Sequence, residues 1–243
     1  MRTAQTGRRS SPSSDRICEA AITLFRKRGY HGTPMRSIAS AIGLEAGSLY
    51  YHFASKQEIL FAIIDGTMND LLEGLQTATE GPGNPGQRLH AAVRFHVLFH
   101  AYRRDEAFIS RSELRSLTQA NLRRSLGKRD HYEELLCRVL AAGMSTGDFD
   151  VPDARLATMA ILTMCSAVAD WFSERGPLTA EGVAASYAAM VLRTVRAPGR
   201  GSRRAGTSRI ASVQRRRQGG GARRHVGAAS VGSLTGGSWS ARS

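Results

Sequence analysis

Apolar residues recur every three or four positions along most of the chain up to residue 196, and almost no segment alternates apolar and polar residues one by one. This spacing is typical of amphipathic helices, which bury one stripe of side chains and expose the rest. It predicts an all-α protein of about nine helices. The first stripe, in residues 15–28, consists of Ile17, Ala20, Ala21, Leu24 and Phe25.

Capping and breaking residues divide this pattern into separate helices. Thr33, followed by Pro34, predicts a capped start for the second helix, and Gly43 predicts its end. Ser55 predicts the start of a long helix, which the Pro- and Gly-rich segment 80–87 ends. The predicted helices cover residues 15–28, 35–42, 46–52, 56–79, 88–103, 106–116, 119–144, 152–174 and 180–195.

The composition is that of a globular protein. The 243 residues, 42% of them hydrophobic, are enough for one large or two modest domains with a buried core. No run of about 18 apolar residues predicts a membrane span, and no apolar segment follows the basic N-terminus as it would in a secretory signal. Cys18, Cys137 and Cys165 are far apart and form no CxxC pair. We therefore expect buried thiols in a reducing, cytoplasmic compartment, with neither a metal nor a cofactor.

The net charge of +14 is unevenly distributed. Residues 1–53 carry 8 basic and 3 acidic side chains, whereas residues 54–196 carry 16 and 17. Residues 197–243 carry 10 arginines and no acidic residue. Because this last segment is too poor in apolar residues to offset its ordering entropy, we predict a disordered tail, either without a role or acting as a non-specific phosphate-binding arm. Residues 1–13 are predicted to form a flexible basic arm.

Two short predicted helices, 35–42 and 46–52, are joined by a turn that contains Gly43. Two helices joined by a short turn with glycine form the helix-turn-helix, whose second helix enters the major groove of DNA. On that second helix Leu49 and Phe53 share an apolar face, and polar and aromatic side chains occupy the rest. The polar and aromatic face can exchange hydrogen bonds with base edges.

Residues 29–60 read GYHGTPMRSIASAIGLEAGSLYYHFASKQEIL, and this segment resembles the DNA-binding domain of the tetracycline-repressor (TetR) family of bacterial transcriptional regulators. The resemblance implies a helix-turn-helix DNA-binding domain over 14–55 and an all-α ligand-binding and dimerisation domain over 56–196. It also implies a ligand-responsive, nucleoid-associated repressor, which binds a palindromic double-stranded DNA operator as a homodimer and is released by a small hydrophobic effector. The matching residues are Gly29, Tyr30, Thr33, Ile38, Ala39, Gly43, Gly47, Leu49, Tyr50, His52, Phe53, Ser55, Lys56 and Leu60.

Positions that match the family motif imply the contacts with DNA. Thr33, at the start of the first short helix, is expected to contact a phosphate, and Lys56 to bind another at the start of the long helix. Pro34 and Glu45 depart from the family pattern, because hydroxyl residues are common at both positions. Near DNA, the Glu45 carboxylate would repel a phosphate or accept a hydrogen bond from cytosine. The implied DNA-binding residues are Thr33, Arg36, Ser37, Gly47, Ser48, Tyr50, Tyr51, His52 and Lys56.

The second helix of the motif contains no Arg or Lys. Arginine that reads guanine through two hydrogen bonds is the commonest specific base contact, and Arg36 is the residue placed to supply it. We therefore predict that Arg36→Ala relaxes the preference at one base pair in each half-site, whereas Lys56→Ala weakens binding about equally on every sequence. The alternative for Arg36 is a solvated surface cation.

The last two predicted helices, 152–174 and 180–195, are apolar on most sides and rich in alanine. A helix that is buried on two sides requires such a surface. The TetR family forms homodimers through its two final helices, so we expect a homodimer through these two. The alternative is the ordinary core of a monomer.

The ligand site is predicted from aromatic, methionine and arginine residues in the second half of the chain. His96 and His100 lack a third ligand at useful spacing, so we expect core or pocket lining rather than a metal site. The SELRSL run and the C-terminal part from Trp171 resemble the TetR subgroup that represses fatty-acid and sterol breakdown, which implies an acyl-CoA effector whose phosphates meet arginines. The predicted ligand-binding residues are Phe95, Phe99, Tyr102, Arg103, Arg111, Met144, Met164 and Trp171.

Two other classes of function fit the sequence less well. An enzyme is not expected, because the chain has no HExxH, GxSxG, P-loop or dinucleotide-binding motif and no acid–base cluster. An architectural nucleoid protein that binds DNA without a ligand stays the alternative. The near-neutral charge of residues 54–196 argues against it.

Overall fold

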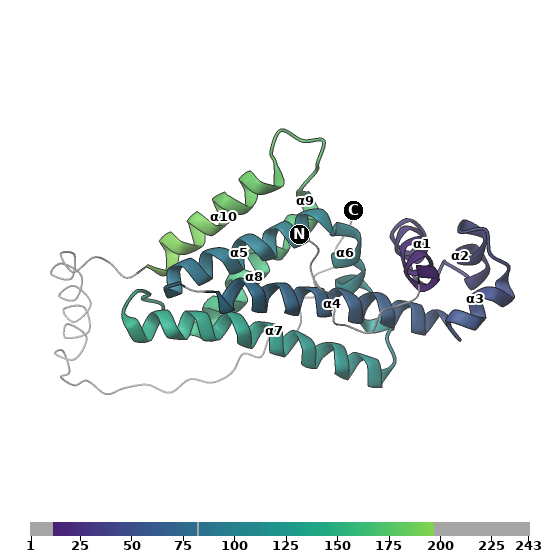
Figure 1. Ribbon diagram of the computed structural model, residues 1–243, viewed down its shortest axis with the longest axis horizontal. Helices are drawn as coiled ribbons and strands as arrows, with labels where there is room; N and C mark the ends of the chain where they lie inside the picture. Colours follow the sequence, from purple (N-terminus) through teal and green to yellow (C-terminus); the bar gives the residue numbers. More distant parts are fainter. Residues whose placement is uncertain (1–11, 82, 197–243) are drawn as a thin grey trace, which may run out of the picture. The chain divides into compact units, whose positions relative to one another are not determined.

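The computed structural model describes residues 12–81 and 83–196, and within these ranges the protein is all-α, as predicted (Figure 1). The basic arm, apart from its last two residues, and the arginine-rich tail predicted above lie outside the described residues. The helices are α1 (Pro12–Arg28), α2 (Met35–Ala41), α3 (Ala46–His52), α4 (Lys56–Glu80), α5 (Pro85–Tyr102), α6 (Arg104–Ser112), the 3₁₀-helix η1 (Leu114–Ser116), α7 (Gln119–Thr146), α8 (Ala154–Ser166), α9 (Val168–Trp171) and α10 (Ala180–Val195).

A small bundle is formed by α1, α2 and α3 and is closed by the beginning of α4. Ile17, Ile38 and Leu49, one from each of the three helices, have no exposed surface. The same apolar cluster includes Ile59 of α4 and Ile109 of α6. The core of the small bundle is therefore continuous with two helices that also belong to the second half of the chain.

The second half of the chain is built around α5. This helix packs against α4, α7, α8 and α10, and α10 lies alongside it in Figure 1. Leu89, Val93 and Val97 project from α5 into the shared hydrophobic core. None of the helices in the described residues is long and apolar enough to cross a membrane.

Polar side chains fix the starts of most of the long helices. Ser55 accepts a hydrogen bond from the Glu58 N–H at 3.2 Å, as its predicted capping role requires. Asn84 and Gln87 form a reciprocal capping box at the start of α5. Such caps satisfy N–H groups that have no partner in the first turn of a helix. Thr118, Asp153 and Thr179 cap α7, α8 and α10 in the same way.

Some boundaries differ from the predicted ones. Because the Asn84 capping box starts α5 at Pro85, this helix begins inside the segment that was predicted to be a breaker. Pro34 is the N-cap of α2 rather than its first residue, and no side chain caps that helix. The predicted helix 152–174 is divided at Ala167 into α8 and α9, and the predicted helix 106–116 is divided into α6 and η1.

Candidate functional site

The helix α3 has one buried and one exposed face. Leu49 has no exposed surface and holds the helix onto the small bundle. Tyr51 is 88% exposed and Tyr50 is 53% exposed, and Gly47 and Ser48 are exposed beside them. Two exposed tyrosines on one short helix form an aromatic surface of the kind that marks a contact with a partner.

The turn before α3 depends on Gly43. Its φ of 69° lies in the left-handed region, where a side chain is strained. The Leu44 N–H then donates to the Ala39 carbonyl at 2.9 Å, which closes the end of α2. The turn therefore fixes the direction in which α3 leaves α2, as a helix-turn-helix requires.

The outward surface of α2 and α3 contains a single cation, Arg36. Its side chain is exposed, and within the described residues it has no ion-pair partner. Ser37 and His52 are half-buried, and the His52 ring meets Tyr51 edge-on with 5.4 Å between the ring centroids. The predicted DNA-binding residues of these helices thus lie at the surface, and their individual contacts with DNA stay predictions.

Thr33 is buried beside the end of α1. Its side chain has no exposed surface, and its hydroxyl donates to the Gly29 carbonyl at 2.8 Å. The hydroxyl therefore satisfies a carbonyl at the end of α1 instead of capping α2. The hydroxyl has no accessible surface in this structure, and the predicted phosphate contact of Thr33 stays a prediction.

Lys56 is held by the backbone between α1 and α2. Its ammonium group donates to the carbonyls of Tyr30 at 2.7 Å, Thr33 at 2.9 Å and His31 at 3.4 Å, and it lies 4.4 Å from the centroid of the Tyr30 ring. Desolvation lowers the pKa of Lys56 from its ordinary value. An ammonium has three protons, and all three have carbonyl partners here. Lys56 thus ties α4 to the turn after α1, and its predicted phosphate contact would have to share these protons.

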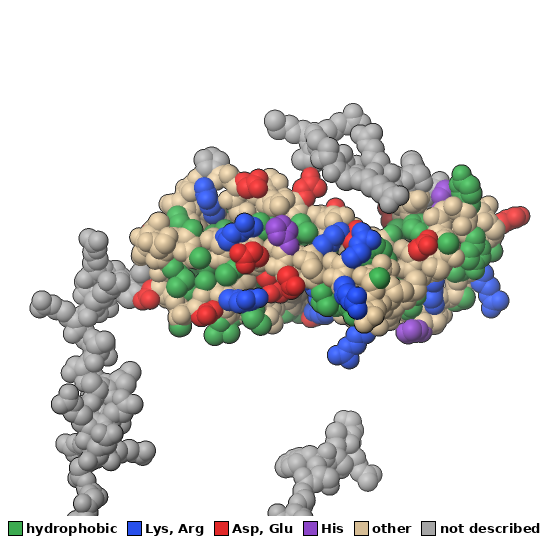
Figure 2. Space-filling view, turned by 90° about the horizontal axis from the view of Figure 1, so that it is seen from below, with side chains coloured by type: hydrophobic (Ala, Val, Ile, Leu, Met, Phe, Trp, Pro, Cys, Tyr) green, Lys and Arg blue, Asp and Glu red, His purple; other side chains and the backbone are tan. Residues whose placement is uncertain are grey.

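Charges of both signs are mixed on the second half of the chain. Figure 2 shows Lys and Arg side chains interspersed with Asp and Glu side chains over the visible face. Arg103 pairs with Asp70 of α4 and with Glu106, and Arg111 pairs with Asp170 of α9. Of the four arginines considered for the CoA phosphates (Arg103, Arg104, Arg111 and Arg115), Arg103 and Arg111 therefore already have carboxylate partners.

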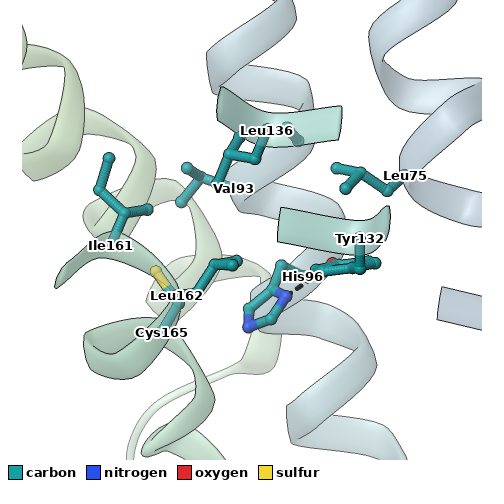
Figure 3. A pocket seen from close by; sticks show the side chains of 9 residues that line it. Leu75, Val93, His96, Tyr132, Leu136, Ile161, Leu162 and Cys165 are labelled. Atoms are coloured by element: carbon teal, nitrogen blue, oxygen red, sulfur yellow. Dashed lines mark hydrogen bonds between the residues drawn. The ribbon is translucent and has the colours of Figure 1, made fainter. Parts of the chain in front are cut away.

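An internal cavity lies between α4, α5, α7 and α8 (Figure 3). Its side chains are packed so closely that the space between them does not admit a water molecule. We call it the α5–α8 cavity. It is lined by Leu75 of α4, by Ala92, Val93 and His96 of α5, by Tyr132 and Leu136 of α7, and by Ile161, Leu162 and Cys165 of α8.

None of the predicted ligand-binding residues lines the α5–α8 cavity. Phe99 belongs to the hydrophobic core, and Phe95 and Met144 pack against that core. Tyr102, Met164 and Trp171 are 54%, 39% and 47% exposed. Sequence reasoning named residues by type, whereas the cavity is lined mainly by ordinary aliphatic residues. The sequence could have indicated these residues only by their position, because each of them lies on the apolar, inward-facing stripe of its helix.

His96 is the polar centre of the α5–α8 cavity. Its Nδ1 lies 2.7 Å from the Tyr132 hydroxyl, drawn as a dashed line in Figure 3, and its Nε2 lies 3.0 Å from Ser166 Oγ. The His100 ring stacks beside it, with 4.2 Å between centroids. Burial, with a smaller contribution from His100, lowers the pKa of His96 well below its ordinary value. His96 is therefore neutral at pH 7. The prediction that this histidine pair is core or pocket lining is confirmed, because both His96 and His100 are buried.

No group of three or more His, Cys, Asp or Glu side chains in the described ranges is arranged to hold a metal ion. All three cysteines are free thiols. Cys165 is buried, and burial raises its pKa to about 12. Cys18 and Cys137 are only partly buried, which differs from the prediction for these two.

A helix-turn-helix joined to a larger helical domain is typical of DNA-binding regulators. Residues 17–63 match the family described as bacterial regulatory proteins of the tetR family, and residues 82–195 match the tetracyclin repressor-like C-terminal domain. The protein therefore belongs to the TetR family of DNA-binding transcriptional regulators.

Similar proteins from bacteria agree with this assignment. The HTH-type transcriptional repressor KstR2 of Mycobacterium tuberculosis (strain ATCC 25618 / H37Rv) is 29% identical over 180 residues, which cover 72% of this chain and 89% of KstR2. The crystal structure of the TetR family regulator PfmR from Thermus thermophilus is 33% identical, with a TM-score of 0.69 over 74% of this chain and 98% of PfmR. The crystal structure of AibR in complex with isovaleryl coenzyme A and operator DNA is 28% identical, with a TM-score of 0.67 over 73% of this chain and 96% of AibR.

Proposed function

We propose that this protein is a transcriptional repressor that binds a palindromic operator as a homodimer and releases it when a small acyl-CoA occupies the helical domain. The observation that carries the DNA-binding part is the exposed face of α3, where Tyr50 and Tyr51 stand outward from a helix anchored by Leu49. An anchored short helix with exposed polar and aromatic groups fits the major groove.

The dimer is proposed to form through α8 and α10. Leu156, Met159 and Met164 of α8 are 64%, 52% and 39% exposed, and Met190 of α10 is 38% exposed. Thr158, Ile161 and Cys165, on the opposite face of α8, are buried. One apolar face of α8 is buried by the protein's own chain. A second copy of the protein is suited to bury the other, exposed apolar face.

The acyl-CoA part is supported by the cavity and by the relatives. The α5–α8 cavity is lined mostly by apolar side chains, which suits the hydrocarbon part of a ligand. AibR, a similar protein, was crystallised with isovaleryl coenzyme A and operator DNA. In this proposal the helices around the α5–α8 cavity move apart to admit the acyl group, because the space is too narrow for a water molecule in this structure. This site replaces the ligand site predicted from residue type.

A selection of operators followed by footprinting tests the proposal. The purified protein should select a short palindrome from random DNA and protect both half-sites. Isovaleryl-CoA should weaken this binding, whereas free coenzyme A should not. Continuous protection without sequence preference would favour the architectural alternative, and unchanged binding with every short-chain acyl-CoA would remove the effector from the proposal.

A further inference from the structure

Glu45 brings an exposed negative charge to the helix-turn-helix. It lies between Leu44 of the turn and Ala46, the first residue of α3. The match of residues 17–63 to the tetR family makes this segment part of the DNA-binding domain. Because every phosphate of DNA is negative, a carboxylate near the DNA backbone weakens binding to all sequences. A carboxylate at this position therefore calls for a favourable contact that offsets the repulsion.

The fold does not use the Glu45 side chain. The backbone carbonyl of Glu45 accepts from the N–H groups of Ser48 at 3.1 Å and Leu49 at 3.3 Å, but its side chain makes no capping hydrogen bond. Among residues 12–81 and 83–196 the carboxylate has no ion-pair partner. Ser, Thr, Asp and Asn are the side chains that cap the start of a helix, and Glu is not among them. The carboxylate is therefore available for a contact outside the chain.

The backbone of Glu45 is held in a fixed position relative to α3. The left-handed Gly43 and the 2.9 Å hydrogen bond from the Leu44 N–H to the Ala39 carbonyl define the turn before it. Leu49, which has no exposed surface, anchors the helix after it. In helix-turn-helix proteins the residues at the beginning of the second helix contact the edges of bases. Glu45 therefore lies at the end of α3 that reads bases in such proteins.

The chemistry of the major groove determines which base a carboxylate selects. An ionised carboxylate only accepts hydrogen bonds, whereas guanine presents two acceptors in the major groove and thymine presents an acceptor and a methyl group. Adenine presents an amino donor beside its N7 acceptor, which repels a carboxylate, and cytosine presents its N4 amino donor. Cytosine is therefore the base that fits the Glu45 carboxylate best. Because α3 contains no Arg or Lys, no cation on the same helix neutralises this charge.

We infer that Glu45 is a specificity-determining residue, whose carboxylate accepts a hydrogen bond from the N4 amino group of one cytosine in each half-site. The inference rests on the proposed function, since it requires that the protein select an operator, and it adds one base that the operator contains. Sequences without this cytosine leave the carboxylate desolvated and without a donor. Glu45 therefore selects by weakening the binding of wrong sequences more than that of the right one.

A variant and a modified base together test this contact. The operator that the wild-type protein selects is synthesised with N4-methylcytosine at each symmetry-related pair of cytosines in turn, which blocks the amino hydrogen in the major groove and keeps the one used in base pairing. Fluorescence anisotropy should show that the wild-type protein loses affinity roughly tenfold or more at one such pair. Glu45→Ala should bind this modified operator as well as the unmodified one. Glu19→Ala, which removes the same charge from the exposed surface of α1, should keep the wild-type loss.

A second variant separates base reading from charge. Glu45→Gln should move the preference at this base pair from cytosine towards adenine, which glutamine reads through two hydrogen bonds. An equal gain in affinity of Glu45→Ala for all sequences would overturn the inference, because it would mean phosphate repulsion alone. A lower Tm of Glu45→Ala with an unchanged base preference would also overturn it, because the carboxylate would then only stabilise the dipole of α3. In both cases the selected palindrome, and with it the proposed function, would stand. If the wild-type protein selects no palindrome, the inference and the proposed function fail together.

Discussion

Replacing Lys56 with methionine separates a structural role from a DNA-binding role. Lys56→Met keeps the apolar stem and removes the ammonium, which leaves the carbonyls of Tyr30 and Thr33 without their donor at 2.7 and 2.9 Å. Hydrogen bonds to charged groups contribute about 1.5–3 kcal/mol when buried, and water replaces part of this at a partly exposed site. We therefore expect a loss of about 1–2 kcal/mol in the free energy of unfolding.

Thermal unfolding followed by circular dichroism measures this loss. For a chain of this size the expected decrease in Tm is about 3–6 °C. Lys27→Met is the matched control, because Lys27 is exposed at the end of α1 and should leave the Tm unchanged. A phosphate contact predicts the opposite: an unchanged Tm and a salt dependence of DNA binding that falls by about one counterion per half-site. That second result would refute the role of Lys56 in tying α4 to the turn.

Three further variants test other parts of the structure. Arg36→Ala should reduce the binding free energy that distinguishes the preferred base pair at one position of each half-site by roughly 1–3 kcal/mol. In a competition assay, an equal loss of affinity for all DNA sequences would refute base reading by Arg36. Gly143→Ala should destabilise the protein by about 1–3 kcal/mol, because its Cβ would lie 2.0 Å from the Phe149 ring; a wild-type denaturation midpoint would contradict this. Stability should decrease as the pH falls below about 6.5, because unfolded His96 takes up a proton that the folded state, with its lowered pKa, does not. A pH series of Tm values should show a smaller acid loss in His96→Leu, and identical slopes would contradict this cause.

The all-α fold and the helix-turn-helix followed from local patterns in the sequence. The spacing of apolar residues in α1 and the turn at Gly43 depend on neighbouring residues, which a single sequence contains. The burial of Leu49 and the exposure of Tyr51 also followed, because side chains on a short helix divide between two faces.

The α5–α8 cavity did not follow, because it depends on which helices become neighbours. Leu75 and Ile161 are far apart in the chain and resemble any other core residues, yet both line the α5–α8 cavity. Thr33 and Lys56 were assigned by position in a family motif. Their hydrogen bonds to the backbone around the end of α1 become visible only in three dimensions.

The most direct test of the central claim is the affinity of Tyr51→Ala for the operator that the wild-type protein selects. Tyr51 is 88% exposed, so its removal should leave the Tm unchanged. If α3 reads DNA, fluorescence anisotropy should show at least about a tenfold loss of affinity for the operator and little change on scrambled DNA, since a base contact is worth about 1–3 kcal/mol. Wild-type affinity and preference in Tyr51→Ala would contradict the account of α3 as the reading helix.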